Sequence, residues 1–178
     1  MPTTGRYGNI KKTNLSLDEV GYSKFWLNLV DDFTTLQTPA AGTVLGDSKK
    51  IATAHTWAAN KGAMELYVDE NTLEAPGDTV GDKGNLRLKW TPKLFLPGDG
   101  PEVEELLENL KNLPLIGFAQ DGCDNTKQLL QYGNADLPLK ITKVSPSSGT
   151  LTGGKKGWMI ETECYNRYFY NATLTVRA

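Results

Sequence analysis

The sequence predicts a mainly β protein, a two-sheet β-sandwich or barrel with one α-helix on its flank, and three observations support this prediction. Hydrophobic and polar side chains alternate in about nine short segments, which is the period of a β-strand. Only one segment has the 3.6-residue period of an amphipathic helix. No repeat of fixed length and no regular succession of strand and helix occurs, so a parallel α/β sheet is not expected.

The size and composition fit one globular domain. The chain has 178 residues, of which 39% are hydrophobic and 22% are charged, enough for one core but too few for two comfortable ones. No apolar run is long enough for a membrane span or a secretory signal, so we expect no membrane partner and synthesis in a cytosolic compartment. Cys123 and Cys164 are then expected to be free thiols.

The first part of the chain combines a polar arm, a strand and two long loops. Residues 1–20 are polar and lack a period, which predicts an extended N-terminal arm, and residues 21–178 are predicted to form a single β-sandwich domain. The first strand is expected at 24–30. Long loops rich in glycine and proline are predicted at 31–50 and 71–84, and loops of this length often serve function or assembly.

Three further strands are predicted around these loops. Alternation over 51–57 and over 64–69 predicts two strands joined by a turn at Gly62. A longer strand is predicted at 86–96, where Pro92 indicates a sheet edge or a bulge. One face of that strand is apolar and carries Leu86, Leu88, Trp90, Leu94 and Leu96.

The segment 101–112 is predicted to be the helix. Its apolar residues follow the spacing i, i+3, i+4 and i+7 and are Val103, Leu106, Leu107 and Leu110. Pro101 suits the first helical position, the glutamates of the first turn favour the positive end of the helix dipole, and Pro114 prevents continuation. Because the rest of the chain is β, we expect this helix to lie on a sheet.

The C-terminal part is predicted to be a meander of short strands. The segments between these strands are rich in Gly, Asn, Asp and Ser, which favour turns. The predicted strands are 115–119, 128–132, 137–144, 158–165 and 168–176.

Charge is unevenly distributed along the chain. The formal net charge is −2, which is too small and of the wrong sign for strong non-specific binding to nucleic acid or to a membrane surface. Residues 1–136 carry 13 basic and 19 acidic side chains, whereas residues 137–178 carry 6 and 2. This asymmetry fits either charge balance within one molecule or complementary faces through which copies of the chain stack.

One segment resembles a phosphate-binding loop. The residues from Gly149 to Lys156 match the pattern G-x-x-x-x-G-K up to its last place. That place holds Lys156 instead of the Ser or Thr that ligates magnesium, and a strand rather than a helix is predicted to follow. We therefore interpret these glycines as part of a hairpin.

The other candidate residues also have structural explanations. His55 is the single histidine, no nucleophile elbow accompanies it, and its neighbours predict a sheet position. The cysteines lack the spacing of a zinc site, and the segment around Asp121 and Asp124 lacks the ligand order of an EF-hand. The helix glutamates are expected to be solvated and the C-terminal aromatic residues to pack on a sheet. No catalytic residue, metal site or cofactor is predicted, and the protein is not expected to be an enzyme.

The order of these elements resembles that of the phage tail tube (major tail) protein family. The resemblance covers residues 24–178. It concerns the order of the elements and the residue pattern within them, and it includes no invariant motif. It is carried by the strand NLRLKWTPKLFLP, the helix PEVEELLENLKNL, the strand PLIGFAQD and the closing segment GKKGWMIETECYNRYFYNATLTV.

This resemblance implies a structural virion protein without catalytic activity. Members of the family form rings, expected here to be hexameric, that stack into the hollow tail through which phage DNA passes. The expected partners are copies of the chain, other phage tail proteins and DNA in transit, and the expected location is the virion tail after synthesis in the host cytoplasm. The arm 1–20 and the loops 31–50 and 71–84 would bridge rings. Acidic side chains that would line the lumen and repel DNA are Glu65, Asp69, Glu161 and Glu163.

Three alternatives remain open at the level of sequence. The first is another virion ring or decoration protein, such as a tail terminator or neck protein. The second is a monomeric carbohydrate-binding β-sandwich module that would use Trp57, Trp90 or Trp158. The third is an enzyme with a site around His55.

Overall fold

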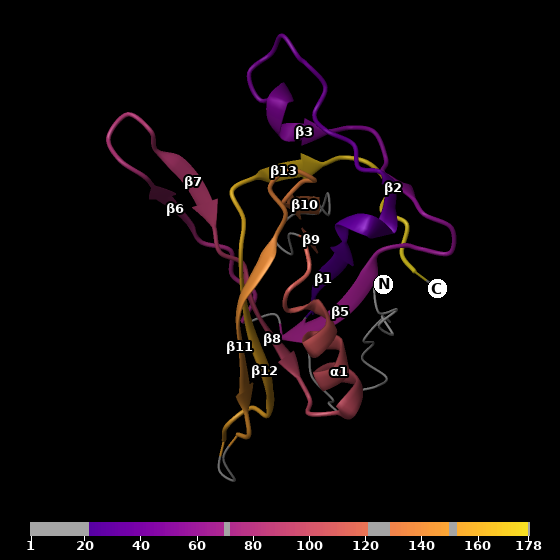
Figure 1. The fold of residues 1–178 in the computed structure, drawn as a ribbon, viewed down its shortest axis with the longest axis vertical. Coiled ribbons are helices and arrows are strands. Elements are labelled where there is room, and N and C mark those ends of the chain that lie inside the picture. The colour runs from indigo at the N-terminus through magenta and orange to yellow at the C-terminus, as the bar shows by residue number, and fades with distance from the viewer. Residues whose placement is uncertain (1–21, 70–71, 121–128, 150–152, 178) are drawn as a thin grey trace.

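A computed structural model describes residues 22–69, 72–120, 129–149 and 153–177 of the chain. The described part is mainly β with one α-helix on the flank of a sandwich, which confirms the predicted fold class (Figure 1). The larger sheet has six strands in the order β3 (Lys50–Ile51), β13 (Arg167–Tyr170), β10 (Leu129–Tyr132), β9 (Leu115–Gln120), β1 (Tyr22–Leu29) and β5 (Met64–Asp69). Its neighbouring strands are antiparallel except for the β13–β3 pair.

The second sheet and two strand pairs complete the β-structure. The three-stranded sheet has the antiparallel order β11 (Lys140–Ser147), β12 (Gly157–Glu163) and β8 (Lys93–Pro97). The two-stranded pairs are β2 (Phe33–Thr35) with β4 (Thr56–Trp57), and β6 (Gly77–Val80) with β7 (Arg87–Trp90). Two short 3-10 helices, η2 (Val30–Asp32) and η3 (Asp47–Lys49), lie in the connections.

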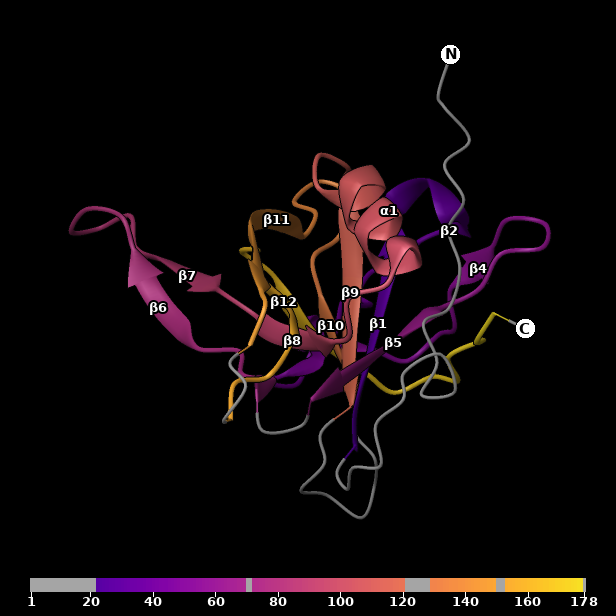
Figure 2. The same ribbon diagram turned by 90° about the horizontal axis from the view of Figure 1, so that it is seen from below.

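The main core lies where the two sheets and the helix meet. Phe25 and Leu27 of β1 point into it, as do Leu94 of β8 and Ile160 of β12. Helix α1 (Pro101–Leu110) covers the same side of the six-stranded sheet (Figure 2). It buries the four residues that the helical period predicts, Val103, Leu106, Leu107 and Leu110. Alternation therefore predicts correctly which face of each of these elements is buried.

A second core covers the opposite face of the six-stranded sheet. Trp26 points to this side because it alternates with Phe25 and Leu27, and it joins Ile116, Phe118 and Tyr170 there. The β2–β4 pair and the segment after β13 pack over these residues. The backbone N–H of Ala63 donates to the carbonyl of Thr175 over 2.8 Å, so the C-terminal segment runs beside β5. The six-stranded sheet is thus buried on both faces.

The predicted long strand 86–96 is wrong in one respect, because Pro92 divides it in two. Proline has no N–H to donate to a ladder, but its carbonyl can accept. The Pro92 carbonyl accepts from the backbone N–H of Thr162 over 2.9 Å and from its Oγ1 over 2.8 Å. The residues before Pro92 form β7, and those after it form β8 in a different sheet.

The predicted loops 31–50 and 71–84 also contain more structure than expected. Strand β6 lies inside 71–84 and pairs with β7, forming a hairpin that projects from the body in both views (Figures 1 and 2). We call residues 77–90 the projecting arm. The loop 31–50 contains β2 and η3, and the predicted strand 51–57 is extended only at its two ends. These pairings join segments that carry no clear period of their own.

Candidate assembly surfaces

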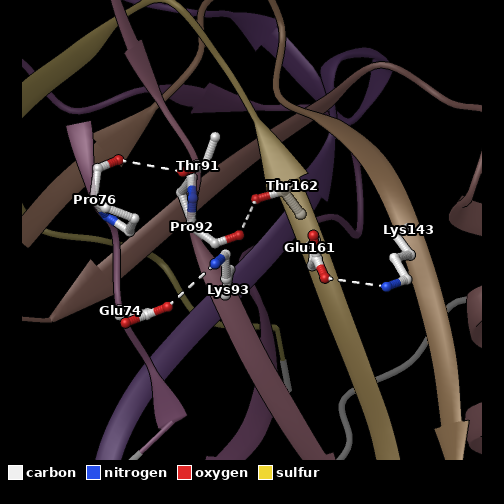
Figure 3. A network of polar contacts seen from close by, with 8 residues as sticks. All are labelled: Glu74, Pro76, Thr91, Pro92, Lys93, Lys143, Glu161 and Thr162. Atoms are coloured by element: carbon white, nitrogen blue, oxygen red, sulfur yellow. Dashed lines mark hydrogen bonds and ion pairs between the residues drawn. The ribbon is translucent and has the colours of Figure 1, made fainter. Parts of the chain in front are cut away.

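Two of the four carboxylates expected to line a lumen lie together on the three-stranded sheet. Glu161 and Glu163 of β12 point away from the main core, because Ile160, Thr162 and Cys164 point into it or are buried beside it. Both carboxylates have lysine partners. The Glu161 carboxylate lies 3.6 Å from Nζ of Lys143 on β11 (Figure 3), and the Glu163 carboxylate pairs with Nζ of Lys89 at the base of the projecting arm.

The outer face of this sheet is consequently a surface of mixed charge. Lys93 of β8 and Lys143 of β11 flank Glu161 in the strand register. Nζ of Lys93 lies 3.4 Å from the Glu74 carboxylate, and Figure 3 shows this ion pair. The hydrogen bond and the charge of Glu163 raise the pKa of Lys89 above its ordinary value, so this lysine stays cationic.

The other two carboxylates lie on the six-stranded sheet. Glu65 and Asp69 belong to β5, where Met64, Leu66 and Val68 point into the main core and the acidic residues point to the opposite face. The Asp69 carboxylate pairs with Nζ of Lys155 from the β11–β12 connection. The structure thus brings the four residues together as two pairs on two sheets, and not as one acidic cluster.

The segment that resembles a phosphate-binding loop belongs to the connection between β11 and β12. These two strands pair in antiparallel orientation, so the connection is that of a hairpin, as predicted. Residues 150–152 lie outside the described residues. The two lysines of the segment serve ion pairs within the chain, because Lys155 pairs with Asp69 and Nζ of Lys156 lies 2.7 Å from the Asp99 carboxylate. No helix follows that could direct its amides at a phosphate.

His55 is buried in the second core and does not lie in a strand, which corrects its predicted sheet position. Its Nε2 lies 2.7 Å from Oε1 of Gln131, and its Nδ1 accepts the backbone N–H of Gln37 over 3.0 Å. The ring stacks on Tyr170 with 4.7 Å between centroids. Both ring nitrogens are therefore engaged, Nε2 with β10 of the six-stranded sheet and Nδ1 with the segment that follows β2.

An open cavity and the residue types that bind metals are the remaining candidates for a ligand site. An open cavity of about 340 Å³ lies between the end of α1 and the start of β11, and its lining includes Lys111, Leu113 and Ile141. Among the described residues, no group of three or more His, Cys, Asp or Glu side chains could hold a metal ion. Asp121, Asp124 and Cys123 lie outside the described residues. No described helix has the length and apolar character to cross a membrane.

Cys164 is a free, buried thiol, as predicted. Its Sγ–H donates to the carbonyl of Asn166 over 3.3 Å, and burial raises the pKa of the thiol to about 12. A thiol with such a pKa is almost fully protonated at neutral pH and is a poor nucleophile.

The tryptophans proposed for carbohydrate binding are engaged in packing. The ring of Trp57 lies 4.2 Å from that of Phe33. The Trp90 ring is covered by the guanidinium of Arg167 at 3.8 Å, and the backbone of Gly77 lies close to its edge. Trp158 is partly buried against the main core. These contacts do not favour an open stacking platform for a sugar.

The most conspicuous exposed apolar residues lie on two projections. Leu86 and Leu88 of the projecting arm are 59% and 52% exposed, and Val44 and Leu45 of the segment before η3 are also exposed. The sequence pattern placed both leucines of the arm on one apolar face with Leu94 and Leu96, and this grouping is wrong, because Leu94 and Leu96 are buried in a different sheet. The alternation could not show that Leu94 and Leu96 enter the main core, whereas only Trp90 of the residues from 86 to 91 packs against it. Exposed apolar side chains on an arm outside the body indicate a contact surface.

Strand β11 provides a second surface that can pair with another chain. It is an edge strand, since β12 is its single neighbour in the described sheets. An unpaired edge presents backbone N–H and C=O groups that can bind an added strand, although Pro146 removes one donor.

Comparisons of the chain with protein-family models, with curated proteins and with solved structures found no match. The functional proposal therefore combines the resemblance of the sequence to the tail tube family with the surfaces described above.

Proposed function

We propose that this chain is a structural virion protein that assembles with its own copies into stacked, hexameric rings and so builds the hollow tail tube through which phage DNA passes. The tail tube itself rests on the resemblance of the sequence, and the observation that most directly supports self-assembly is the projecting arm. A hairpin that leaves the body and exposes Leu86 and Leu88 is stabilised when a neighbouring molecule covers it.

Two further features support assembly from many copies. The open edge of β11 is removed when subunits join their sheets in a closed ring. The outer face of the three-stranded sheet has lysines beside Glu161 and Glu163. If this face lines a lumen, its mixed charge has no strong net attraction for a passing phosphate backbone.

Electron microscopy of negatively stained, purified protein tests the proposal, with light scattering on the same samples over a range of protein and salt concentrations. Hollow tubes or stacked rings are the expected result. Single rings that never stack would instead indicate a tail terminator, neck or decoration protein. Monomers at every concentration would contradict self-assembly of the chain.

A further inference from the structure

Arg167 presents a guanidinium that has no carboxylate partner among the described residues. It is the first residue of β13, and its guanidinium lies 3.8 Å from the ring centroid of Trp90 and 5.6 Å from that of Phe169. Stacking on an aromatic ring holds the guanidinium plane in place while its N–H groups stay available to an acceptor. The side chain is thus oriented before any partner arrives.

Apolar side chains extend from this arginine in two directions. Phe169 follows it on the same face of β13 and is 38% exposed. Leu88 lies on the same face of β7 as Trp90, because successive side chains of a strand alternate, and the exposed Leu86 precedes β7 on the projecting arm. We call Leu86, Leu88, Trp90, Arg167 and Phe169 the arginine patch. Aromatic residues and arginine surrounded by apolar contacts are typical of the centre of a protein interface.

The chain itself carries a surface of opposite charge at some distance from this patch. Helix α1 exposes four glutamates, none of which forms an ion pair with a described residue: Glu102, Glu104, Glu105 and Glu108. The projecting arm itself is of mixed charge, since it exposes Asp78 and Asp82 as well as Lys83 and Arg87, so Arg167 is the cation on which the patch relies. Figure 1 shows α1 and β13 well apart along the long axis of the molecule.

We propose that the arginine patch of one copy binds the exposed glutamate face of α1 in a second copy. Arg167 would form a charge-assisted pair with a helix carboxylate, while Leu88 and Phe169 would cover the aliphatic stems of the glutamates. The two surfaces differ and lie apart, so the contact is heterologous and can repeat from copy to copy. This inference rests on the proposed self-assembly and specifies which surfaces make one of its contacts.

A charge exchange tests this contact by sedimentation velocity of the full chain. Arg167→Glu alone and Glu105→Lys with Glu108→Lys alone are each expected to weaken self-association roughly tenfold or more. The chain that carries all three substitutions is expected to recover most of the association, because the opposite charges face each other again. Lys24→Glu, which reverses an exposed cation on β1, is the matched control and is expected to associate like the wild type.

Association of Arg167→Glu at the wild-type level would overturn the contact, and so would failure of the triple variant to recover. Circular dichroism verifies that each variant is folded. If Arg167→Glu does not fold, Arg167→Gln with the same helix variants replaces it, and equal association of Arg167→Gln and wild type overturns the contact.

The outcome for the tube is read separately by electron microscopy. Tubes that form equally well from wild type and Arg167→Glu would overturn the α1 contact and leave the proposed function standing. Charge-dependent association that recovers in the triple variant, but never yields rings or tubes, would support the contact and contradict the tube. A wild-type chain that stays monomeric at every concentration overturns both proposals.

Discussion

His55 is a buried imidazole that its surroundings hold in the neutral form. Because the backbone N–H of Gln37 donates to Nδ1, that nitrogen carries no proton, and Nε2–H donates to Gln131. The ring is faced by Phe33, Phe118 and Tyr170. Of these groups only Tyr170 titrates, and burial raises the pKa of its hydroxyl, so it stays neutral as well. Burial lowers the pKa of His55 below its ordinary value, while its hydrogen bond to Gln131 raises it by less.

The folded protein is therefore expected to lose stability as pH falls through about 6.5, the ordinary pKa of histidine. The unfolded chain binds a proton there, whereas the folded chain resists it until pH reaches the lowered pKa of His55. Urea denaturation at pH 7.5, 6.5 and 5.5 measures this loss. The chain has a single histidine, so His55→Asn is expected to reduce the pH dependence in this window. An identical pH dependence in both proteins would contradict the role of His55.

Gly133 is a second residue whose role follows from its backbone conformation. Its φ is +87°, and a Cβ added there would lie 2.6 Å from the backbone nitrogen of Leu139. Gly133→Ala is expected to lower the free energy of unfolding by more than about 2 kcal/mol, since an unfavourable φ and a backbone clash add. Gly84→Ala is the control, because Gly84 has φ +94° with open space around it and is expected to cost only about 1 kcal/mol. Equal losses, measured by urea denaturation, would show that the clash is relieved without cost.

The chemistry of single residues could be predicted from the sequence only in part. The phosphate-binding pattern lacks its final Ser or Thr, and a strand was predicted to follow it. On these grounds the sequence correctly predicted that Gly149 and its neighbours belong to a hairpin connection. The environment of His55 could not be predicted, because its partners Gln131 and Tyr170 lie 76 and 115 residues away in sequence. For the same reason, the pairing of Glu163 with Lys89 was not predicted.

At the level of elements, α1 is the part that local signals determine most completely. The predicted helix begins at Pro101, as observed, and its last described helical residue is Leu110 rather than residue 112. Lys111 follows as the C-cap. Its period, its proline at the first position and its glutamates all favour the same structure.

Truncation of a buried helix residue is expected to destabilise the protein strongly. Leu107 is 3% exposed and packs in the main core, so Leu107→Ala is expected to lower the free energy of unfolding by about 2–5 kcal/mol. Glu108→Ala on the exposed face is expected to change it by less than about 0.5 kcal/mol. Urea denaturation measures both values. A loss at Leu107 no larger than that at Glu108 would mean that the helix does not seal the core.

The strands were less predictable than the helix, because a strand needs a partner from elsewhere in the chain. Strand β6 has the sequence GDTV, is mostly exposed and shows no apolar face, yet it pairs with β7. Pro92 indicated a bulge or an edge, but whether the chain would continue in the same sheet depends on the bond from Thr162, 70 residues away. Patterns within one segment cannot show such pairings.

At the scale of the whole molecule, two cores on the two faces of one sheet make the central strands apolar on both sides. In β9, Leu115 faces the main core and Ile116 faces the second core. The sequence predicts such strands as buried, but it does not show which segments cover each face. Here the second face is covered by Phe33, Trp57 and Leu174, which come from opposite ends of the chain. Most of the projecting arm stays outside both cores, and Trp90 at its base packs against the main core.

The arm is therefore expected to affect assembly without affecting the stability of the subunit. In a chain with Leu86→Ser and Leu88→Ser, both half-exposed leucines are lost while Leu94 and Leu96 of the core remain. We expect its free energy of unfolding to change by less than about 1 kcal/mol and its assembly to be impaired, because the apolar surface that a neighbour would cover is gone.

Thermal unfolding at a concentration that keeps the subunit monomeric measures the first effect, and light scattering with electron microscopy measures the second. Leu137→Ser is the matched control, since Leu137 is also exposed, at 39%, but lies outside the arm. Because apolar contacts are little screened by salt, the defect of the double variant is expected to persist at high salt, whereas loss of an ion pair matters less there. Normal assembly of the double variant would show that the arm serves another purpose than joining subunits.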